Sequence, residues 1–185
     1  MISIQLNDEH RKIIADRAPS LDIGGFSNLA SNDLGKATRE DFQITGIAGE
    51  LAWYLFRHGN ESKFIETFDH KANTIVPKGK GDNGFDDSIT FNNKTRFVDI
   101  KSSHVENEDK IQYLNLVIPQ REYHNNMIYI CAFTVGKDRR NVDRVILAGW
   151  ETSEYITDRW KYDNNKFAVQ TKNLRPMKEL DRFIR

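Results

Sequence analysis

The stretch GDNGFDDSITFNNKTRFVDIKSS, residues 81–103, decides the predicted fold of this chain. It contains two runs with the composition of β-strands, residues 85–91 and 95–102, and the pair Asn92-Asn93 separates them. Asparagine pairs favour tight hairpin turns because asparagine adopts positive φ angles more readily than most residues do. The stretch therefore predicts a β-hairpin.

Three acidic residues lie on the strands of this predicted hairpin. Side chains alternate along a strand, so Asp99 and Lys101 project from the same face. A two-residue turn places Asp86 opposite Asp99, whereas a turn that includes Lys94 places Asp87 there. Both alternatives bring two carboxylates face to face, and the length of the turn decides which aspartate is involved.

Two facing carboxylates repel each other, and the repulsion requires a compensating charge. A divalent cation supplies that charge, and Mg²⁺ in particular binds few protein carboxylates, keeps several waters and accepts phosphate oxygens. The alternative is that Asp99 and Lys101 form a surface ion pair while Asp86 and Asp87 are turn residues. We favour the metal site because Asp99 lies on an apolar strand, a glycine-rich loop precedes the hairpin, and an upstream helix carries Glu50.

Two helices are predicted upstream of the hairpin. Residues 7–18 begin with an asparagine and an aspartate that suit a helix cap, and residues 41–59 have apolar side chains at helical spacing. Glu50 lies at the edge of the apolar face of the second helix. The polar residues 19–40 are expected to form a loop or lid, and residues 62–69 are predicted as a strand or an irregular crossing.

Three further strands are predicted after the hairpin, from apolar runs at residues 114–118, 127–135 and 142–150. The order of helix, strands, short helix and strand predicts an α/β fold with a mixed sheet. The 185 residues are expected to form one domain. In it, a core of about residues 41–150 lies between an N-terminal helix and loop, residues 1–40, and a C-terminal extension, residues 151–185.

The composition restricts the classes of function. Lys plus Arg and Asp plus Glu both number 27, so a non-specific polyanion binder that relies on bulk charge is disfavoured. The single cysteine, Cys131, lies in an apolar run and is expected to be a buried structural thiol. Neither a signal peptide nor a membrane-spanning run is evident, so we expect a cytoplasmic protein without membrane contact.

The acidic residues resemble a known group of enzymes. The segment GIAGELA with Glu50, the segment GDNGFDD with Asp86, and the strand DIKSS with Asp99 are similar to the motifs of the PD-(D/E)xK nuclease superfamily. The resemblance covers about residues 41–150 and implies a restriction-endonuclease-like mixed β-sheet flanked by helices. Two departures are present: Phe85 replaces the proline of the motif name, and Asp99 stands where glutamate is commoner.

The resemblance implies a role for each of these residues. Asp86 and Asp99 would bind Mg²⁺ or Mn²⁺, and the backbone carbonyl of Ile100 would be a further ligand. Glu50 would hold a metal-bound water or a second ion. Lys101 would orient or deprotonate the attacking water and stabilise the charge that develops on the phosphate oxygens.

Weaker candidates surround this set. Gln120 follows a predicted strand at a position where the superfamily often has polar active-site residues, Ser102 follows the catalytic lysine, and Asp87 is the alternative metal ligand. The turn at residues 137–140 is predicted to meet a phosphate backbone. The same is predicted for lysines that precede the hairpin, namely Lys71, Lys78 and Lys80.

These observations predict a Mg²⁺-dependent deoxyribonuclease, most simply an endonuclease in restriction, phage defence or DNA processing. A homodimer is expected, because cleavage of both strands by one-site domains usually requires two of them. Two alternatives remain open at this point. One is a nuclease-like binding or inhibitor protein without turnover, and the other is a nuclease that acts on RNA.

Overall fold

The structure is a computed structural model. It describes residues 1–18, 38–73, 85–91, 93–159, 161–163 and 166–184. Most of the predicted loop at residues 19–40 lies outside these ranges, as do Lys78, Lys80 and the glycine-rich segment 81–84. The side chain of Lys71 also lies outside them.

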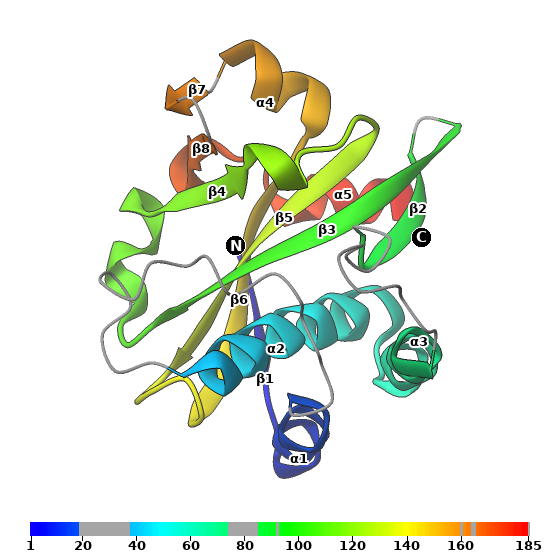
Figure 1. Cartoon of the computed structure of the whole chain (residues 1–185), viewed down its shortest axis with the longest axis vertical. Helices are drawn as coiled ribbons and strands as arrows, with labels where there is room; N and C mark the ends of the chain where they lie inside the picture. The colour runs from blue at the N-terminus through cyan, green and yellow to red at the C-terminus, as the bar shows by residue number, and fades with distance from the viewer. Residues whose placement is uncertain (19–37, 74–84, 92, 160, 164–165, 185) are drawn as a thin grey trace.

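The centre of the fold is a five-stranded mixed sheet (Figure 1). Only β3 and β5 are parallel to each other, and the other neighbours are antiparallel. This arrangement confirms the predicted α/β class with a mixed sheet. The strand order across the sheet is β1 (Ile2–Gln5), β6 (Val142–Thr152), β5 (Met127–Gly136), β3 (Lys94–Val105) and β2 (Asp87–Phe91).

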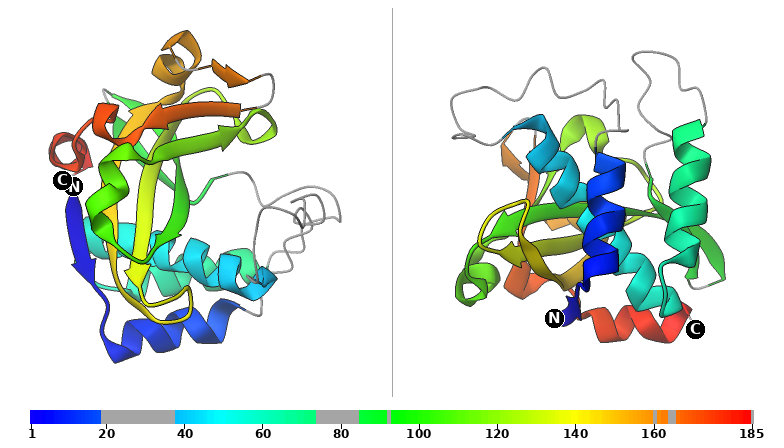
Figure 2. Two further views of the ribbon diagram at one scale, coloured as in Figure 1. Left: turned by 90° about the vertical axis from the view of Figure 1, so that its left-hand side faces the viewer. Right: turned by 90° about the horizontal axis from the view of Figure 1, so that it is seen from below.

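Helices cover one face of this sheet, and a second sheet covers the other (Figure 2). On the first face, Val98 and Ile100 of β3 join a hydrophobic cluster with residues of four helices. The helices are α1 (Asp8–Arg17), α2 (Arg39–His58), α3 (Ser62–Asn73) and α5 (Met177–Ile184).

The second sheet was not predicted from the sequence. It is antiparallel, with the order β4 (Asn115–Pro119), β8 (Lys166–Gln170) and β7 (Lys161–Asp163). Its buried side chains form a second hydrophobic cluster with β5, and α4 (Ser153–Arg159) adds Ile156 to that cluster. Cys131 belongs to the same cluster, and burial raises the pKa of its thiol to about 12. The expectation of a buried, inert cysteine is confirmed.

α2 begins and ends with the signals that its sequence carries. Thr38 caps the N-terminus by accepting a hydrogen bond from the backbone N–H of Asp41, and Gly59 ends the helix with a φ of 74°. Ile47 and Leu51 on its apolar face are fully buried against the sheet. The predicted helix at residues 41–59 is therefore confirmed, two residues longer at its start.

One expectation about the connections is wrong. Residues 62–69 are helical, because Phe64 and Phe68 are one turn apart and both bury against the first face. The crossover from β3 to β5 contains no α-helix. It is made of two 3₁₀ turns, η3 (Glu108–Tyr113) and η4 (Gln120–Glu122), on either side of β4.

Among the described residues, no helix combines the length and the apolar character that crossing a bilayer requires.

The contact between α2 and β3 is unusually close at Gly49. A Cβ atom at this position would lie 1.9 Å from Oγ of Ser102 and 3.3 Å from Cγ2 of Ile100. A larger residue would push α2 away from the sheet. Gly49 therefore fixes the height of its neighbour Glu50 above the edge of β3.

This packing gives a stability prediction with an internal control. Gly49→Ala should lower the free energy of unfolding by about 1–3 kcal/mol because the methyl group overpacks the contact with Ser102. Gly46→Ala, in the same helix, should raise it by up to about 1 kcal/mol, because its Cβ would meet no described atom within 4 Å.

Chemical denaturation of both variants measures the difference. Adding Ser102→Ala to Gly49→Ala should recover part of the loss, since it removes the nearest atom. Equal effects at the two glycines would show that close packing at Gly49 is unimportant.

Candidate active site

The register of the hairpin resolves the ambiguity between Asp86 and Asp87. The pairing runs from Asp87 with Val98 to Phe91 with Lys94, so Lys94 belongs to the strand and two residues connect β2 to β3. The predicted two-residue connection is confirmed. Asp86 lies one residue before Asp87, whose pair with Val98 ends the ladder on the side away from the turn. The backbone N–H of Asp86 donates to the carbonyl of Val98 over 2.7 Å.

Asp87 faces the helices and has a structural contact there. Its carboxylate accepts a hydrogen bond from Nε1 of Trp53 over 2.7 Å and forms an ion pair with Arg57, both of α2. The side chains of this ion pair are largely buried. Asp87 thus ties the hairpin to α2, and its oxygens are committed to that contact.

Asp86 occupies the edge of β3 that β2 leaves open. Within the described chain, the pairing of β2 stops at Val98, whereas β3 continues to Val105 beside β5 alone (Figure 1). Oδ2 of Asp86 accepts the backbone N–H of Ile100, 2.7 Å away, at this edge. The N–H and C=O of one strand residue point to the same edge, so the carbonyl of Ile100 is directed to the side on which Asp86 lies.

Asp99 is a strongly perturbed acid of the site. Its residue is 7% exposed, and burial raises the pKa of its carboxyl to about 7. The negative charges of Asp86 and Glu122 add to the increase, while Lys101 opposes it. Oδ2 of Asp99 lies 2.9 Å from Nζ of Lys101, as expected for two residues on one face of the strand.

Lys101 connects two carboxylates. Its Nζ lies 2.9 Å from Oδ2 of Asp99 and 2.9 Å from Oε2 of Glu122. Burial disfavours the charged form of the lysine, but the two carboxylates outweigh this cost and raise its pKa above the ordinary value. Lys101 therefore carries its proton throughout the neutral range.

Glu122 belongs to the site, and the sequence reasoning missed it. It ends η4, just after the candidate Gln120, whose side chain is exposed. Tyr129 holds this corner in place, because its hydroxyl donates to the carbonyl of Glu122 over 3.2 Å and accepts the N–H of His124 over 2.9 Å. Tyr129 pairs with Asp99 in the sheet, so one residue of β5 adjoins both acids.

Glu50 approaches the same edge from α2. Tyr54, one helical turn later, donates its hydroxyl to the backbone carbonyl of Asp86 over 3.0 Å. Burial raises the pKa of Tyr54, and the charges of Asp87, Glu50 and Asp86 raise it further. Glu50 is therefore a further source of negative charge around this hydroxyl, beside Asp86 and Asp87 of the hairpin.

Ser102 lies apart from this group. It projects from the helix-covered face of β3, where its Oγ is buried against Gly49 and has no hydrogen-bond partner among the described residues. Its contacts are therefore packing contacts with α2.

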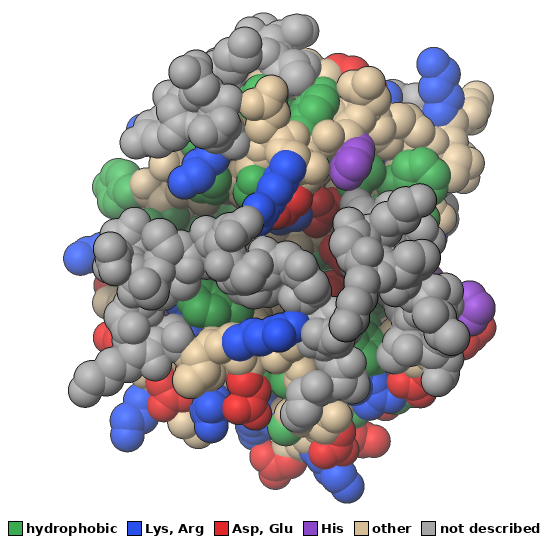
Figure 3. Space-filling model, in the orientation of Figure 1, with side chains coloured by type: hydrophobic (Ala, Val, Ile, Leu, Met, Phe, Trp, Pro, Cys, Tyr) green, Lys and Arg blue, Asp and Glu red, His purple; other side chains and the backbone are tan. Residues whose placement is uncertain are grey.

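Figure 3 shows acidic side chains gathered beside a basic one in the middle of the face that carries the open edge of β3.

The donors at this edge suit a small, hard cation. Among the described residues, no three side chains of Asp, Glu, His or Cys come close enough together to enclose a metal ion. Mg²⁺ needs no such cage, because it is commonly held by one or two carboxylates and keeps several waters. Asp86, Asp99 and the carbonyl of Ile100 provide that kind of open, oxygen-only site.

Comparisons with known proteins add no relative: no family model, no curated protein and no solved structure matches this chain.

The raised pKa of Asp99 predicts a specific dependence of stability on pH. A carboxyl with a pKa of about 7 in the fold and 3.8 as its ordinary value binds its proton more tightly when folded. Its stabilising contribution is complete below pH 4 and is lost as the pH rises through 7. Asp99→Asn removes this titration.

Denaturant unfolding at pH 4, 5.5, 7 and 8 tests this expectation. Relative to Asp99→Asn, the wild type should lose stability progressively between pH 4 and pH 7, with little further change above. A constant difference across the range would mean that Asp99 titrates normally.

Proposed function

We propose that the protein is a Mg²⁺- or Mn²⁺-dependent nuclease that hydrolyses phosphodiester bonds in DNA, on a restriction-endonuclease-like arrangement of hairpin and helix. One observation carries the proposal. The buried carboxylate of Asp99 lies between the edge occupied by Asp86 and the ammonium of Lys101, 2.9 Å away. A carboxylate pair at an open strand edge, with a cation on one side, is suited to binding a metal and an anionic substrate together.

In this proposal Asp86, Asp99 and the Ile100 carbonyl hold the ion, and Glu50 holds a water or a second ion from α2. When bound, the ion polarises the phosphodiester and lowers the pKa of a water. Hydrolysis forms a bond between the water oxygen and phosphorus and breaks the bond to one ester oxygen. The products are a phosphomonoester and a hydroxyl group.

Lys101 acts as a hydrogen-bond donor and a positive charge. Its raised pKa keeps it protonated, so it orients the water or stabilises negative charge on the phosphate oxygens and does not remove a proton. Glu122 is a second carboxylate partner that positions this ammonium, over 2.9 Å. An ammonium with a second carboxylate partner keeps its place when the first carboxylate binds another cation.

A second candidate function follows from the same contacts. Lys101 forms ion pairs with both Asp99 and Glu122, so these three side chains neutralise one another's charges, as in a structural ion-pair network. A nuclease-like protein that binds nucleic acid or a partner without turnover would also retain it. Binding of divalent metal distinguishes the two, because a purely structural network has no need of an ion.

Metal affinity should depend on pH because the ion displaces a proton from Asp99. Calorimetric titration with Mn²⁺ should show an affinity that rises about tenfold per pH unit below pH 7 and levels off above it. Asp99→Ala should abolish binding, whereas Asp109→Asn, an exposed acid in η3, should leave it unchanged. Absence of Mn²⁺ and Mg²⁺ binding in the wild type would overturn the metal site.

Cleavage tests the chemistry. Plasmid, single-stranded DNA and RNA substrates should be incubated with Mn²⁺ and wild type, Lys101→Ala or the exposed control Lys172→Ala. Loss of one charge-stabilising donor should slow DNA cleavage by about 100–1000-fold in Lys101→Ala and leave Lys172→Ala unaffected.

Each other outcome has a defined meaning. Equal cutting by wild type and Lys101→Ala would place the activity elsewhere. Metal and DNA binding without cutting would favour the non-catalytic candidate, and preferential cutting of RNA would change the substrate class. A homodimer is the proposed assembly for cutting two strands, and sedimentation with DNA measures it.

A further inference from the structure

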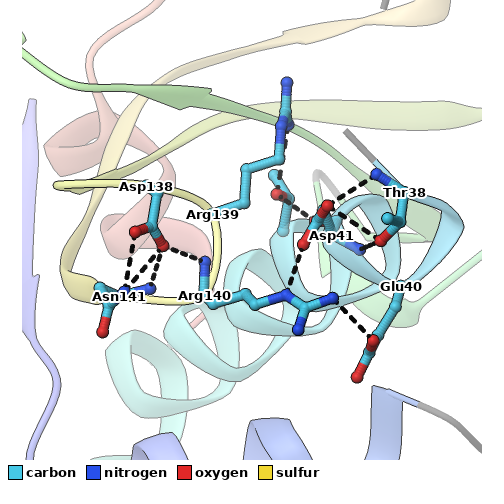
Figure 4. Close-up of polar contacts among 8 residues, drawn as sticks. Thr38, Glu40, Asp41, Asp138, Arg139, Arg140 and Asn141 are labelled. Atoms are coloured by element: carbon cyan, nitrogen blue, oxygen red, sulfur yellow. Dashed lines mark hydrogen bonds and ion pairs between the residues drawn. The ribbon is translucent and has the colours of Figure 1, made fainter. Parts of the chain in front are cut away.

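The turn between β5 and β6 is fixed on the first turn of α2 (Figure 4). The carboxylate of Asp138 accepts the backbone N–H groups of Arg140 and Asn141, each over 2.9 Å, which closes the turn on itself. Arg140 then reaches Asp41 over 2.8 Å and Glu40 over 2.9 Å. Its guanidinium is therefore committed to α2 and is a poor candidate for a phosphate contact.

Arg139 extends away from these acids (Figure 4). Its Cζ lies 4.6 Å from the centre of the Phe42 ring, and its Nη1 lies 3.4 Å from Oγ1 of Thr45. In the described parts of the chain, no carboxylate oxygen lies within 4 Å of its nitrogens. Arg139 is thus a half-buried guanidinium, held in place by an aromatic ring and one hydroxyl.

This arrangement leaves most of the donors of Arg139 available. A guanidinium has five N–H groups in a planar fork, and the described contacts use one of them. Removing a charge from water without an acid beside it costs free energy. Burial accordingly lowers the pKa of Arg139, and the charge of Asp41 offsets this in part. A bidentate anion such as a phosphate would satisfy the remaining donors.

One face of α2 connects Arg139 to the candidate active site. Phe42, Gly46 and Glu50 follow one another at intervals of four residues, so they lie within about 80° of one another around the helix, and Tyr54 follows one turn later. Phe42 lies under Arg139, and Tyr54 contacts the backbone of Asp86. Gly46 contributes no side chain, and a Cβ there would meet no described atom within 4 Å. The helix surface midway between Phe42 and Glu50 therefore has no side chain and no described atom close above it.

The spacing along this face suits a nucleic-acid strand. Eight residues from Phe42 to Glu50 correspond to about 12 Å at a rise of about 1.5 Å per residue. Phosphates of one strand in a duplex are about 3.4 Å apart along the axis. The distance therefore corresponds to about three nucleotides.

We propose that Arg139, seated on Phe42 and Thr45, binds a backbone phosphate about three nucleotides from the scissile phosphate, and that the face of α2 from Phe42 to Glu50 lies beneath the strand between them. The inference rests on the proposed nuclease function and adds to it the path of the substrate. A nucleic acid is the class of ligand that presents phosphates at both places at once.

Binding can be measured separately from cleavage. With Ca²⁺ and a fluorescent DNA oligonucleotide, Arg139→Gln should weaken binding about 10–100-fold and reduce the slope of log affinity against log salt by about 1. Lys172→Gln is the control, because it removes one positive charge from an exposed position in the 3₁₀ turn Thr171–Asn173. It should change affinity less than threefold. Arg139→Lys keeps the positive charge but lacks the planar guanidinium, and it is the milder change for folding. Its loss of DNA affinity should be intermediate.

The position of the contact can be mapped with single neutral linkages. Oligonucleotides carrying one methylphosphonate at successive positions should weaken binding and cleavage by the wild type most strongly about three nucleotides from the cut. Arg139→Gln should show no additional loss at that linkage, because its partner is already absent. Equal losses for Arg139→Gln and Lys172→Gln, or equal sensitivity of wild type and Arg139→Gln at every linkage, would overturn the inference.

The two proposals fail in different ways. Normal DNA cleavage with no specific effect of Arg139→Gln would overturn the phosphate contact and leave the nuclease function intact. DNA binding that depends on Arg139, without cleavage by the wild type, would overturn the nuclease function alone. Absence of DNA binding by the wild type would overturn both.

Discussion

The contact of Asp87 with Trp53 and Arg57 is the constraint on which the site depends. It fixes the first residue of β2 against α2, so the hairpin cannot slide along the helix without breaking a largely buried ion pair. Two adjacent aspartates consequently have different tasks. The carboxylate of Asp87 is bound by Trp53 and Arg57 of α2. Asp86 lies where β2 stops pairing with β3. The same attachment places α2, with Glu50, beside that open edge.

The position of Asp99 is unfavourable for stability and suited to function. A carboxylate removed from water next to a second acid resists ionisation, and Lys101 offsets only part of that cost. Such a group gains most from a further positive charge, whether a proton or a metal ion. Glu122 strengthens this tendency, because it holds Lys101 in place and adds negative charge near Asp99. This local destabilisation is the physical reason why we propose a cation site at this edge.

Features encoded in short segments could be predicted from the sequence, and features that depend on distant contacts could not. The hairpin register follows from two residues between alternating strands, and the limits of α2 follow from its caps. Residues 62–69 were misassigned because a short apolar segment with Phe64 and Phe68 suits either a strand or a helix until its neighbours are known. Glu122 was missed for a similar reason. Its proximity to Lys101 depends on the crossover, which Tyr129 anchors from another strand, and local sequence does not specify that anchor.

The balanced charge of the chain, 27 basic and 27 acidic residues, limits how it can recognise a polyanion. Several arginines on the described surface are neutralised by acids: Arg96 by Glu154, Arg140 by Glu40 and Asp41, and Arg144 by Glu108. Long-range attraction is weak for such a surface. In the proposed function, affinity for nucleic acid comes from short-range contacts of cations that have no acid beside them in the described parts of the chain. Arg139 is one of these, and it is seated on Phe42 of α2, the helix that carries Glu50. The proposal therefore has one helix carry an acid of the site and hold the phosphate contact of the incoming strand.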